Sequence, residues 1–438
     1  MSMPNNRRKF LKLAALTGVG LTSGGMLKGF ASEGRIDPNQ NHHYSINPDN
    51  VQSNEINDSN LSIIGLYGKW ASSINENKLP ALSFRRSEFR NLESWKKTAR
   101  QRTIERLGIP DIGGLPKVTV KKQYSFDGLN IEELSWQLPY GRPTEGILLK
   151  PSKAQGKLPA ILAFHDHGGN KYFGHPKITR TSNNQHPLMK EHQEFYYSNF
   201  GWANEIAKRG YVVLVPDAFT FGSRRVQFQD LPAEFRGEQN DENADTPEKI
   251  KIYNDWAGNH EHVMAKSLFC AGTTWPAVFF SEDRKALDIL SSRPDVDPTR
   301  IGCGGLSGGG LRTVLMGGLD PRIKCAVDVG FMSTWKDFLL NKSYTHTWMT
   351  YIPLLPNELD FPEILGLRVP LPTLVLNDRE DFLYTLPEME RAESILREVF
   401  KKAGAPDKFK CSYYPGPHKF DAAMQEEAFN WFDKWLKS

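Results

Sequence analysis

Hydrophobic and polar residues follow three successive patterns along the 438-residue chain. Residues 32–60 are rich in Asn, Ser, Asp and Pro and lack apolar periodicity, which predicts a flexible linker. Residues 61–116 contain apolar and aromatic clusters, such as those around Trp70 and Trp95, that are typical of short helices packed on a larger body. From residue 117 to residue 438, short apolar runs alternate with helix-compatible stretches. We therefore expect a helical extension followed by one folded domain.

The domain over residues 117–438 begins with signals of antiparallel strands. Apolar residues alternate or cluster around Val118, Ile131 and Gly146, and Asp127-Gly128 is a hairpin signal. Strands are then expected at 160–164, 211–215, 300–304, 323–329, 373–376 and 409–413, and helices at 202–209, 283–291, from 308, 387–403 and 422–436. This alternation predicts an α/β fold, with a mainly parallel sheet, helices on both faces and antiparallel strands at one edge.

A polar segment interrupts the alternation at residues 221–275. Its stretch from Gln227 to Glu248 is polar and charged and shows no strand pattern. Ligands of open α/β sheets bind beyond the carboxyl ends of the strands, and long insertions often lie there. We interpret the segment as an insertion over that edge, part lid and part specificity wall. A solvated loop without a role is an equally open interpretation.

Composition narrows the classes of function. Hydrophobic residues make up 39% and charged residues 24%, so the chain can bury a sizeable core. The 55 basic and 51 acidic residues nearly balance, which argues against a nucleic-acid partner. The four cysteines match no zinc motif. They are Cys270, Cys303, Cys325 and Cys411, and Cys303 and Cys325 lie in apolar runs where we expect free, buried thiols.

Residues 1–31 have the pattern of an export signal. Arg7-Arg8 is followed by a modest apolar stretch from Leu13 to Leu27 and a plausible cleavage site at Ala31. The paired arginines resemble a twin-arginine signal, although Asn6 stands where Ser or Thr is usual. The apolar stretch is short for a membrane-spanning helix of about 20 residues. We expect export to the periplasm or beyond, with a basic membrane anchor as the alternative.

Gly305-Leu306-Ser307-Gly308-Gly309 matches the nucleophile elbow G-x-S-x-G. The motif follows an apolar strand and precedes a helix-compatible stretch, which is the context that this sharp turn requires. Small neighbours allow the close backbone approach, and the serine then lies at the positive end of the helix. The alternative is a glycine-rich phosphate-binding turn, but a P-loop lysine is absent and the turn lies late in the chain. We expect Ser307 to be a nucleophile.

A serine nucleophile needs a base, and the base needs a carboxylate. His418 follows the last expected strand, where this fold places a histidine on a loop. Three acids follow the strand before it, and we expect Asp381 to be the partner of His418, with Asp378 as the rival and Glu380 less favoured. The order Ser, Asp, His is the one that α/β-hydrolases use.

The developing oxyanion needs N–H donors. Gly308 supplies one N–H, and the loop His165-Asp166-His167-Gly168-Gly169 offers the second through His167 or Gly168. His165 and His167 could instead bind a metal, but no third ligand is evident at suitable spacing. No metal or other cofactor is expected.

Three further residues are weaker candidates for contacts with substrate. Asp217 ends a strand, but it could simply pair with a nearby arginine. Trp275 could stack on a sugar face or lie in the core, and His165 begins the oxyanion loop.

These motifs resemble those of the α/β-hydrolase superfamily. The run from His165 to Gly174, the segment Asp217-Ala218-Phe219 and Gly416-Pro417-His418 look like those of bacterial esterases related to dienelactone hydrolases, and most like the acetyl-xylan-esterase-like group. Glucuronoyl esterases usually have Arg where Gly308 stands, and dienelactone hydrolases use Cys where Ser307 stands. The resemblance implies an exported serine esterase that removes acyl groups, above all acetyl, from polysaccharide esters. A peptidase of the same fold and a non-catalytic carbohydrate-binding relative remain alternatives.

Overall fold

The computed structural model describes residues 62–74 and 78–437. These residues belong to one compact unit, Asp58–Ser438. The expected signal at 1–31 and the expected linker at 32–60 lie outside the described residues. Within the described ranges, no helix combines the length and the apolar character that crossing a membrane requires.

The expected helical extension contains helices α2 (Tyr67–Ser73) and α3 (Leu92–Leu107). Helix α3 begins where the Asn91 side chain accepts a hydrogen bond from Ser94 N, and it ends at Gly108 in the left-handed region. Trp95 of α3 is buried, and its indole N–H donates to Leu82 O at 2.7 Å. The extension therefore contributes to the hydrophobic core of the domain.

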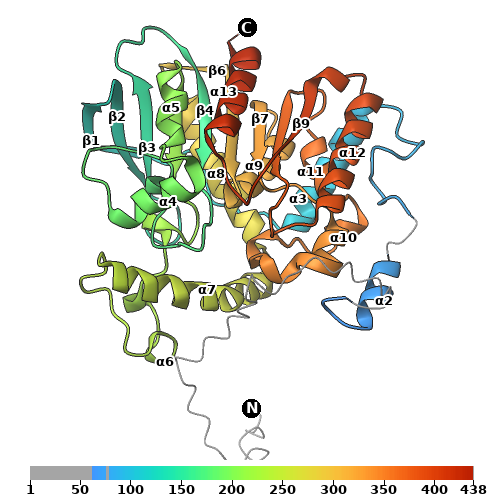
Figure 1. Cartoon of the computed structure of the whole chain (residues 1–438), viewed down its shortest axis with the longest axis horizontal. Helices are drawn as coiled ribbons and strands as arrows, with labels where there is room; N and C mark the ends of the chain where they lie inside the picture. The colour runs from blue at the N-terminus through green and yellow to red at the C-terminus, as the bar shows by residue number, and fades with distance from the viewer. Residues whose placement is uncertain (1–61, 75–77, 438) are drawn as a thin grey trace, which may run out of the picture. The chain divides into compact units, whose positions relative to one another are not determined.

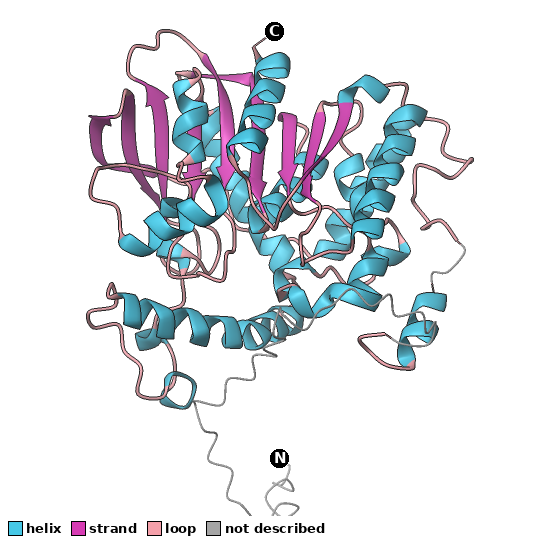
Figure 2. Ribbon diagram, in the orientation of Figure 1, coloured by secondary structure: helices cyan, strands magenta, loops and turns pink. Residues whose placement is uncertain are grey.

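The strands, drawn in magenta in Figure 2, form one nine-stranded sheet. Their order in the sheet is β1-β2-β3-β5-β4-β6-β7-β8-β9. Their bounds are β1 Val118–Phe126, β2 Leu129–Trp136, β3 Thr144–Pro151, β4 Leu158–Phe164, β5 Val212–Pro216, β6 Val296–Leu306, β7 Ile323–Val329, β8 Thr373–Asp378 and β9 Phe409–Tyr414. The pairs β1-β2, β2-β3 and β3-β5 are antiparallel. The other five pairs, which join β5, β4, β6, β7, β8 and β9 in that order, are parallel. The predicted mainly parallel sheet with antiparallel N-terminal strands is confirmed.

Helices cover both faces of this sheet (Figure 1). Neighbouring residues of one strand belong to different hydrophobic clusters, as Ile161 and Leu162 of β4 show, because successive side chains point to opposite faces. One cluster includes α5 (Trp202–Lys208) and α13 (Ala422–Leu436), and the other includes α3, α8 (Trp275–Ser291), α9 (Gly308–Leu319), α11 (Phe361–Gly366) and α12 (Leu386–Lys402). Helix α4 (Pro187–Tyr197) follows the loop after β4.

The interrupting segment at 221–275 is largely helical, which the polar pattern did not predict. It contains α6 (Ala233–Arg236) and the 24-residue helix α7 (Pro247–Cys270), which begins at the capping residue Thr246. The buried residues of α7 recur every three or four positions, so one face of a polar helix packs on the domain. Helix α8 also begins eight residues earlier than expected, because Thr274 caps it and Pro276 fits its first turn.

Short helical pieces occupy the other connections. They are η2 His175–Lys177, η3 Gly222–Arg224, η4 Phe228–Asp230, α10 Trp335–Asp337, the π-helix η5 Phe338–Lys342, η6 Ser343–Thr345, η7 Trp348–Thr350, η8 Leu355–Asn357 and η9 Pro406–Lys408. All four cysteines are free; Cys303 and Cys325 are buried as predicted, Cys411 is half-buried and Cys270 is exposed.

Candidate active site

Ser307 lies in the turn between β6 and α9. Its φ of 58° and ψ of −118° are strained for a residue with a side chain, as a nucleophile elbow requires. The turn is held by Ser307 N, which donates to Val329 O at 2.8 Å. A Cβ on Gly305 or Gly309 would collide with the carbonyl oxygen of Phe164, so glycine is needed at both positions. The half-buried serine thus stands at the N-terminus of α9.

His418 and Asp381 are hydrogen-bonded to each other. Their atoms Nδ1 and Oδ2 are 2.6 Å apart, and both residues are buried. The other oxygen of Asp381 accepts from Leu383 N at 2.9 Å. The rival Asp378 instead accepts from the backbone N–H of Lys419 at 2.9 Å. The geometry therefore joins the histidine to Asp381 and gives Asp378 a separate role in holding the loop.

Burial and charge oppose each other at this histidine. Burial alone would lower the pKa of His418, but the Asp381 carboxylate outweighs it, and the pKa is raised above its usual value. Burial raises the pKa of Asp378 to about 7, and the charge of Asp381 adds to this effect. The ligand atoms of Asp378, Asp381 and His418 all lie within 4.8 Å of one another, so the same three side chains are also close enough to hold a cation.

The His418 ring lies against Gly330, which follows the end of β7 next to the elbow. A Cβ on Gly330 would lie 2.8 Å from His418 Cε1 and 3.2 Å from the Leu306 side chain. Gly330 follows Val329, the residue whose carbonyl holds Ser307 N. Atom Nε2 of His418 is buried and has no hydrogen-bond partner among the described residues, Ser307 included. The structure thus places the His418 ring beside the residues that hold the elbow, and it shows no hydrogen bond between Ser307 and His418.

The loop after β4 packs against the first residue of α9. A Cβ on Gly308 would lie 3.1 Å from His167 N, so the two backbones are in close contact. Among the described residues, the N–H groups of His167 and Gly168 have no hydrogen-bond acceptor. The N–H of Gly308 lies in the first turn of α9, where helical N–H groups have no intrahelical partner. The backbone N of His167 therefore lies beside Gly308, and the N–H groups of His167 and Gly168 are unused.

Side chains of helix α7 hold the loop after β4. Glu261 of α7 accepts from His167 Nε2 at 3.0 Å and pairs with Lys171 Nζ at 2.7 Å. Asn254, seven residues earlier on α7, accepts from the backbone N–H groups of Lys171 and Tyr172, each at 2.9 Å. Burial would raise the pKa of Glu261, but Lys171 and His167 hold it at about 2. Sequence reasoning missed these residues because it did not predict the helix whose spacing places them on one face.

A second set of buried groups surrounds Asp166 in the same loop. Its carboxylate accepts from the Tyr197 hydroxyl and from His192 Nε2, both on α4, the latter at 3.1 Å. Burial would raise the pKa of Asp166, but His192 and Lys177 hold it well below its usual range. Sequence reasoning assigned no role to any of these residues.

The three weaker substrate candidates have structural contacts instead. His165 is buried, and its ring nitrogens meet Ala218 N at 3.1 Å and Asp166 O at 3.0 Å. Asp217 is buried and accepts from His175 N at 2.7 Å and Ser223 N at 2.8 Å, so it joins two loops. Since both rings of the predicted His165–His167 pair have protein partners, the alternative metal site at those histidines also has no free ligands.

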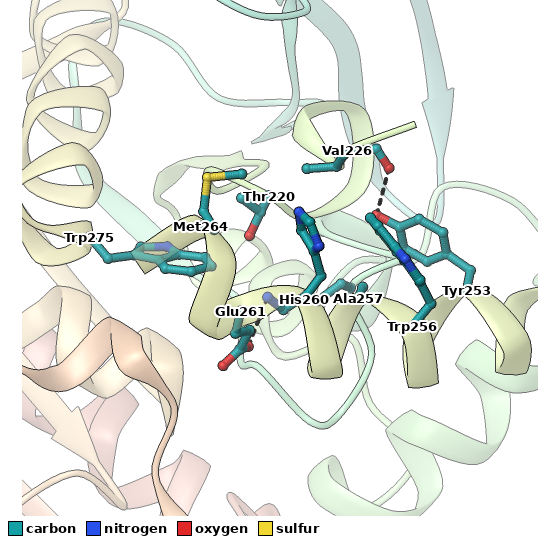
Figure 3. Close-up of a pocket in the computed structure, with 10 residues that line it drawn as sticks. Thr220, Val226, Tyr253, Trp256, Ala257, His260, Glu261, Met264 and Trp275 are labelled. Carbon is teal, nitrogen blue, oxygen red and sulfur yellow. Dashed lines mark hydrogen bonds and ion pairs between the residues drawn. The ribbon is translucent and has the colours of Figure 1, made fainter. Parts of the chain in front are cut away.

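Trp275 is core rather than a sugar platform. It is 1% exposed and lines a small cavity between α7 and the loop after β5 (Figure 3). The ammonium of Lys171 lies 4.7 Å from its ring centroid, and the ring of Phe219 packs edge-on against it at 5.7 Å. Burial at the start of α8 leaves no open face on which a sugar could stack.

Known proteins are similar to this chain in sequence and in fold. No protein-family model matches it. It is 26% identical over 336 residues to "Putative hydrolase YtaP" of Bacillus subtilis, covering 74% of this chain and 96% of that protein. A "putative acetyl xylan esterase" from Bacteroides fragilis superimposes with a TM-score of 0.58 at 18% identity, over 79% of this chain and 81% of the other. A glucuronoyl esterase from Solibacter usitatus gives 0.55 at 15% identity, over 81% and 97%.

The likeness to these solved structures agrees with the observed order and direction of the strands. The chain therefore has the α/β-hydrolase fold, the fold of these solved carbohydrate esterases.

Proposed function

We propose that the chain is a serine carboxylesterase. Ser307 attacks the ester carbonyl while His418 Nε2 takes its proton, and Asp381 holds the histidine and stabilises its charged form. The N–H groups of Gly308 and of His167 or Gly168 stabilise the oxyanion. His418 then protonates the leaving alcohol. In the second half of the reaction, water attacks the acyl group while His418 takes its proton, and His418 returns that proton to Ser307 as the acid leaves.

One observation carries this proposal above the others. A serine in a strained elbow, a histidine with a free buried nitrogen and unused N–H groups all lie at the carboxyl edge of one sheet. The 2.6 Å bond between His418 and Asp381 leaves only Nε2 for the serine proton. The missing serine–histidine hydrogen bond is compatible with this chemistry, because such bonds often tighten only when substrate binds.

The substrate class that we propose is an acyl ester of a polysaccharide or oligosaccharide, with acetyl as the favoured group. Similar solved structures include proteins described as acetyl xylan and glucuronoyl esterases. Gly308 stands where glucuronoyl esterases usually have Arg, which favours acetyl removal. Export by the signal at residues 1–31 fits a substrate outside the cell.

Hydrolysis of 4-nitrophenyl acetate by the purified chain tests the proposal. We expect Ser307→Ala to lower kcat by about 10⁴-fold or more, because the nucleophile is lost. Ser412→Ala is the control and should keep wild-type turnover, since the Ser412 hydroxyl on β9 donates to Glu427 of α13 at 2.7 Å. Equal rates in wild type and Ser307→Ala would refute the assignment. Acetylated glycans and peptides assayed side by side then separate the esterase from a peptidase.

A further inference from the structure

Lys177 is a fully buried lysine at the end of η2. Its Nζ donates to the carbonyl oxygens of Asp166 and His167, each at 2.8 Å. A buried ammonium is costly unless it is paired with an anion. Here the nearest carboxylate oxygen, Oδ2 of Asp166, is 4.0 Å away and has no hydrogen-bond partner among the described residues, whereas Tyr197 and His192 both bond Oδ1. The two short hydrogen bonds of the lysine therefore go to the main chain.

Those two carbonyls belong to the two peptide groups that carry the candidate oxyanion donors. The carbonyl of Asp166 shares its peptide plane with the N–H of His167, and the carbonyl of His167 shares its plane with the N–H of Gly168. In a trans peptide the N–H points opposite to the C=O. An ammonium that holds both carbonyls on one side thus directs both N–H groups to the other side, away from itself.

The same contacts make these N–H groups better donors. A cation at the carbonyl oxygen polarises the peptide group, and hydrogen bonds in a chain strengthen one another in a low-dielectric interior. The backbone N of His167 lies beside Gly308, the residue after the serine. The positive charge is therefore placed behind the site where negative charge develops in the proposed reaction.

We propose that Lys177 is a positioning residue of the oxyanion hole, which orients and polarises the N–H groups of His167 and Gly168. This inference rests on the proposed esterase function. It gives the loop a buried charge that acts through the backbone and touches no substrate.

The variant Lys177→Met tests the inference in the full chain. It keeps an unbranched apolar side chain, one heavy atom shorter, and removes the ammonium. We expect kcat to fall by about 10- to 100-fold with KM nearly unchanged, because transition-state stabilisation is lost. Binding of an aryl boronic acid, which forms a tetrahedral adduct with the serine, should weaken by a similar factor.

Lys402→Met is the matched control. Lys402 Nζ also donates to two main-chain carbonyls, of Phe84 and Arg86, but it lies on α12 and contacts the N-terminal extension. This variant should keep kcat and boronate affinity. A folded Lys177→Met that stays within about twofold of wild type in both quantities would overturn the inference.

The pH dependence of the wild type decides the matter if Lys177→Met does not fold. Burial lowers the pKa of Lys177 to about 8. The charged groups that act on it are the acids Asp166 and Asp217 and the bases Lys171 and Arg312. We expect kcat and boronate affinity to fall together as the pH rises through about 8, whereas constant values of both from pH 7 to 9 would overturn the inference.

A readout that does not need turnover separates this inference from the proposed function. In Ser307→Ala, the backbone amide resonances of His167 and Gly168 should shift with the apparent pKa of Lys177, and Lys177→Met should abolish that titration. If these resonances titrate but wild type shows no esterase activity, the proposed function is wrong and the contact stands. If wild type is active and the resonances do not titrate, the inference about Lys177 fails alone.

Discussion

Two regions at the carboxyl edge of the sheet are built in different ways. The loops after β8 and β9 bring Asp381 and His418 together through one 2.6 Å hydrogen bond. These loops leave adjacent strands, whose register ends at the pair Asp378 and Tyr414. The loop after β4 is instead held by charged and polar side chains from three elements: α4, η2 and α7.

The difference follows from what the sheet can position. Two loops that begin at paired strand ends inherit their separation from the backbone hydrogen bonds, so a few side-chain contacts, such as those of Asp378 and Asp381, complete the geometry. The loop after β4 must instead present N–H groups in a defined direction. Its own backbone contributes the hydrogen bond from Asn170 N to His167 O at 3.0 Å, and the remaining constraint comes from side chains. Buried ion pairs and carbonyl contacts supply that constraint. Substitutions in the first region should therefore remove chemistry, and those in the second should weaken it.

Between these two regions, the largest effect is expected at the acid Asp381. Asp381→Asn should lower kcat/KM by about 10³- to 10⁴-fold, because the histidine loses the carboxylate that orients it. Asp378→Asn is the matched control and should cost less than about tenfold. Wild-type kcat/KM should fall as the pH drops through the raised pKa of His418, since only the neutral ring accepts a proton. In Asp381→Asn the residual activity should persist to lower pH, because the main cause of that raised pKa is gone. The reverse ranking of the two variants would assign the acid to Asp378.

A smaller effect is expected where α7 supports the oxyanion loop. Glu261→Gln keeps the shape but removes the charge that pairs with Lys171 and His167, so kcat should fall by about tenfold. Glu248→Gln, on the exposed first turn of the same helix, should leave kcat unchanged. Steady-state kinetics measure the loss of kcat, and thermal unfolding checks stability. A lower kcat in Glu261→Gln with an unchanged unfolding midpoint would locate the effect in the loop. Equal kcat in both variants would show that α7 covers the loop without positioning it.

The smallest effect is expected on the free energy of unfolding. It concerns the difference between two buried carboxyl groups, those of Asp166 and Asp328. Asp166 has hydrogen-bond partners, whereas neither oxygen of Asp328 on β7 has one among the described residues. Burial raises the pKa of Asp328 to about 8, so the folded state holds a proton that the unfolded state has lost above pH 4. The free energy of unfolding of the wild type should therefore decline between about pH 4 and 8 on this account.

Asp328→Asn removes that decline. Its free energy of unfolding should exceed that of the wild type by an amount that grows from pH 4 to 8 and reaches on the order of 1 kcal/mol or more. Urea unfolding at several pH values measures the difference. The exposed residue Asp407 provides the control, since Asp407→Asn should change the free energy little at any pH. A difference at Asp328 that stays constant with pH would contradict the buried, uncharged carboxyl.

Much of the fold was predictable because its signals are local in sequence. Apolar runs marked β4 to β9, and the glycines around Ser307 marked the turn that only small residues tolerate. The preference for Asp381 over Asp378 came from spacing in one loop, and the hydrogen bond to His418 agrees with it. Helix α7 was not predicted because its buried positions, such as Tyr253 and Glu261, stand among polar residues. Trp275 could not be placed, since an aromatic residue serves equally in a core or on a surface.

The sequence by itself determined the succession of strands along the chain, the turn at Ser307 and the loops that carry Asp381 and His418. Each depends on residues within a few positions of one another, where steric and periodic rules apply directly. Only the tertiary structure decided that Lys177 and Glu261 meet the loop after β4, because those contacts join segments 10 and 94 residues apart. A charge in a sequence is a solvated side chain by default, and only packing around it reveals that it is buried and which backbone atoms it holds.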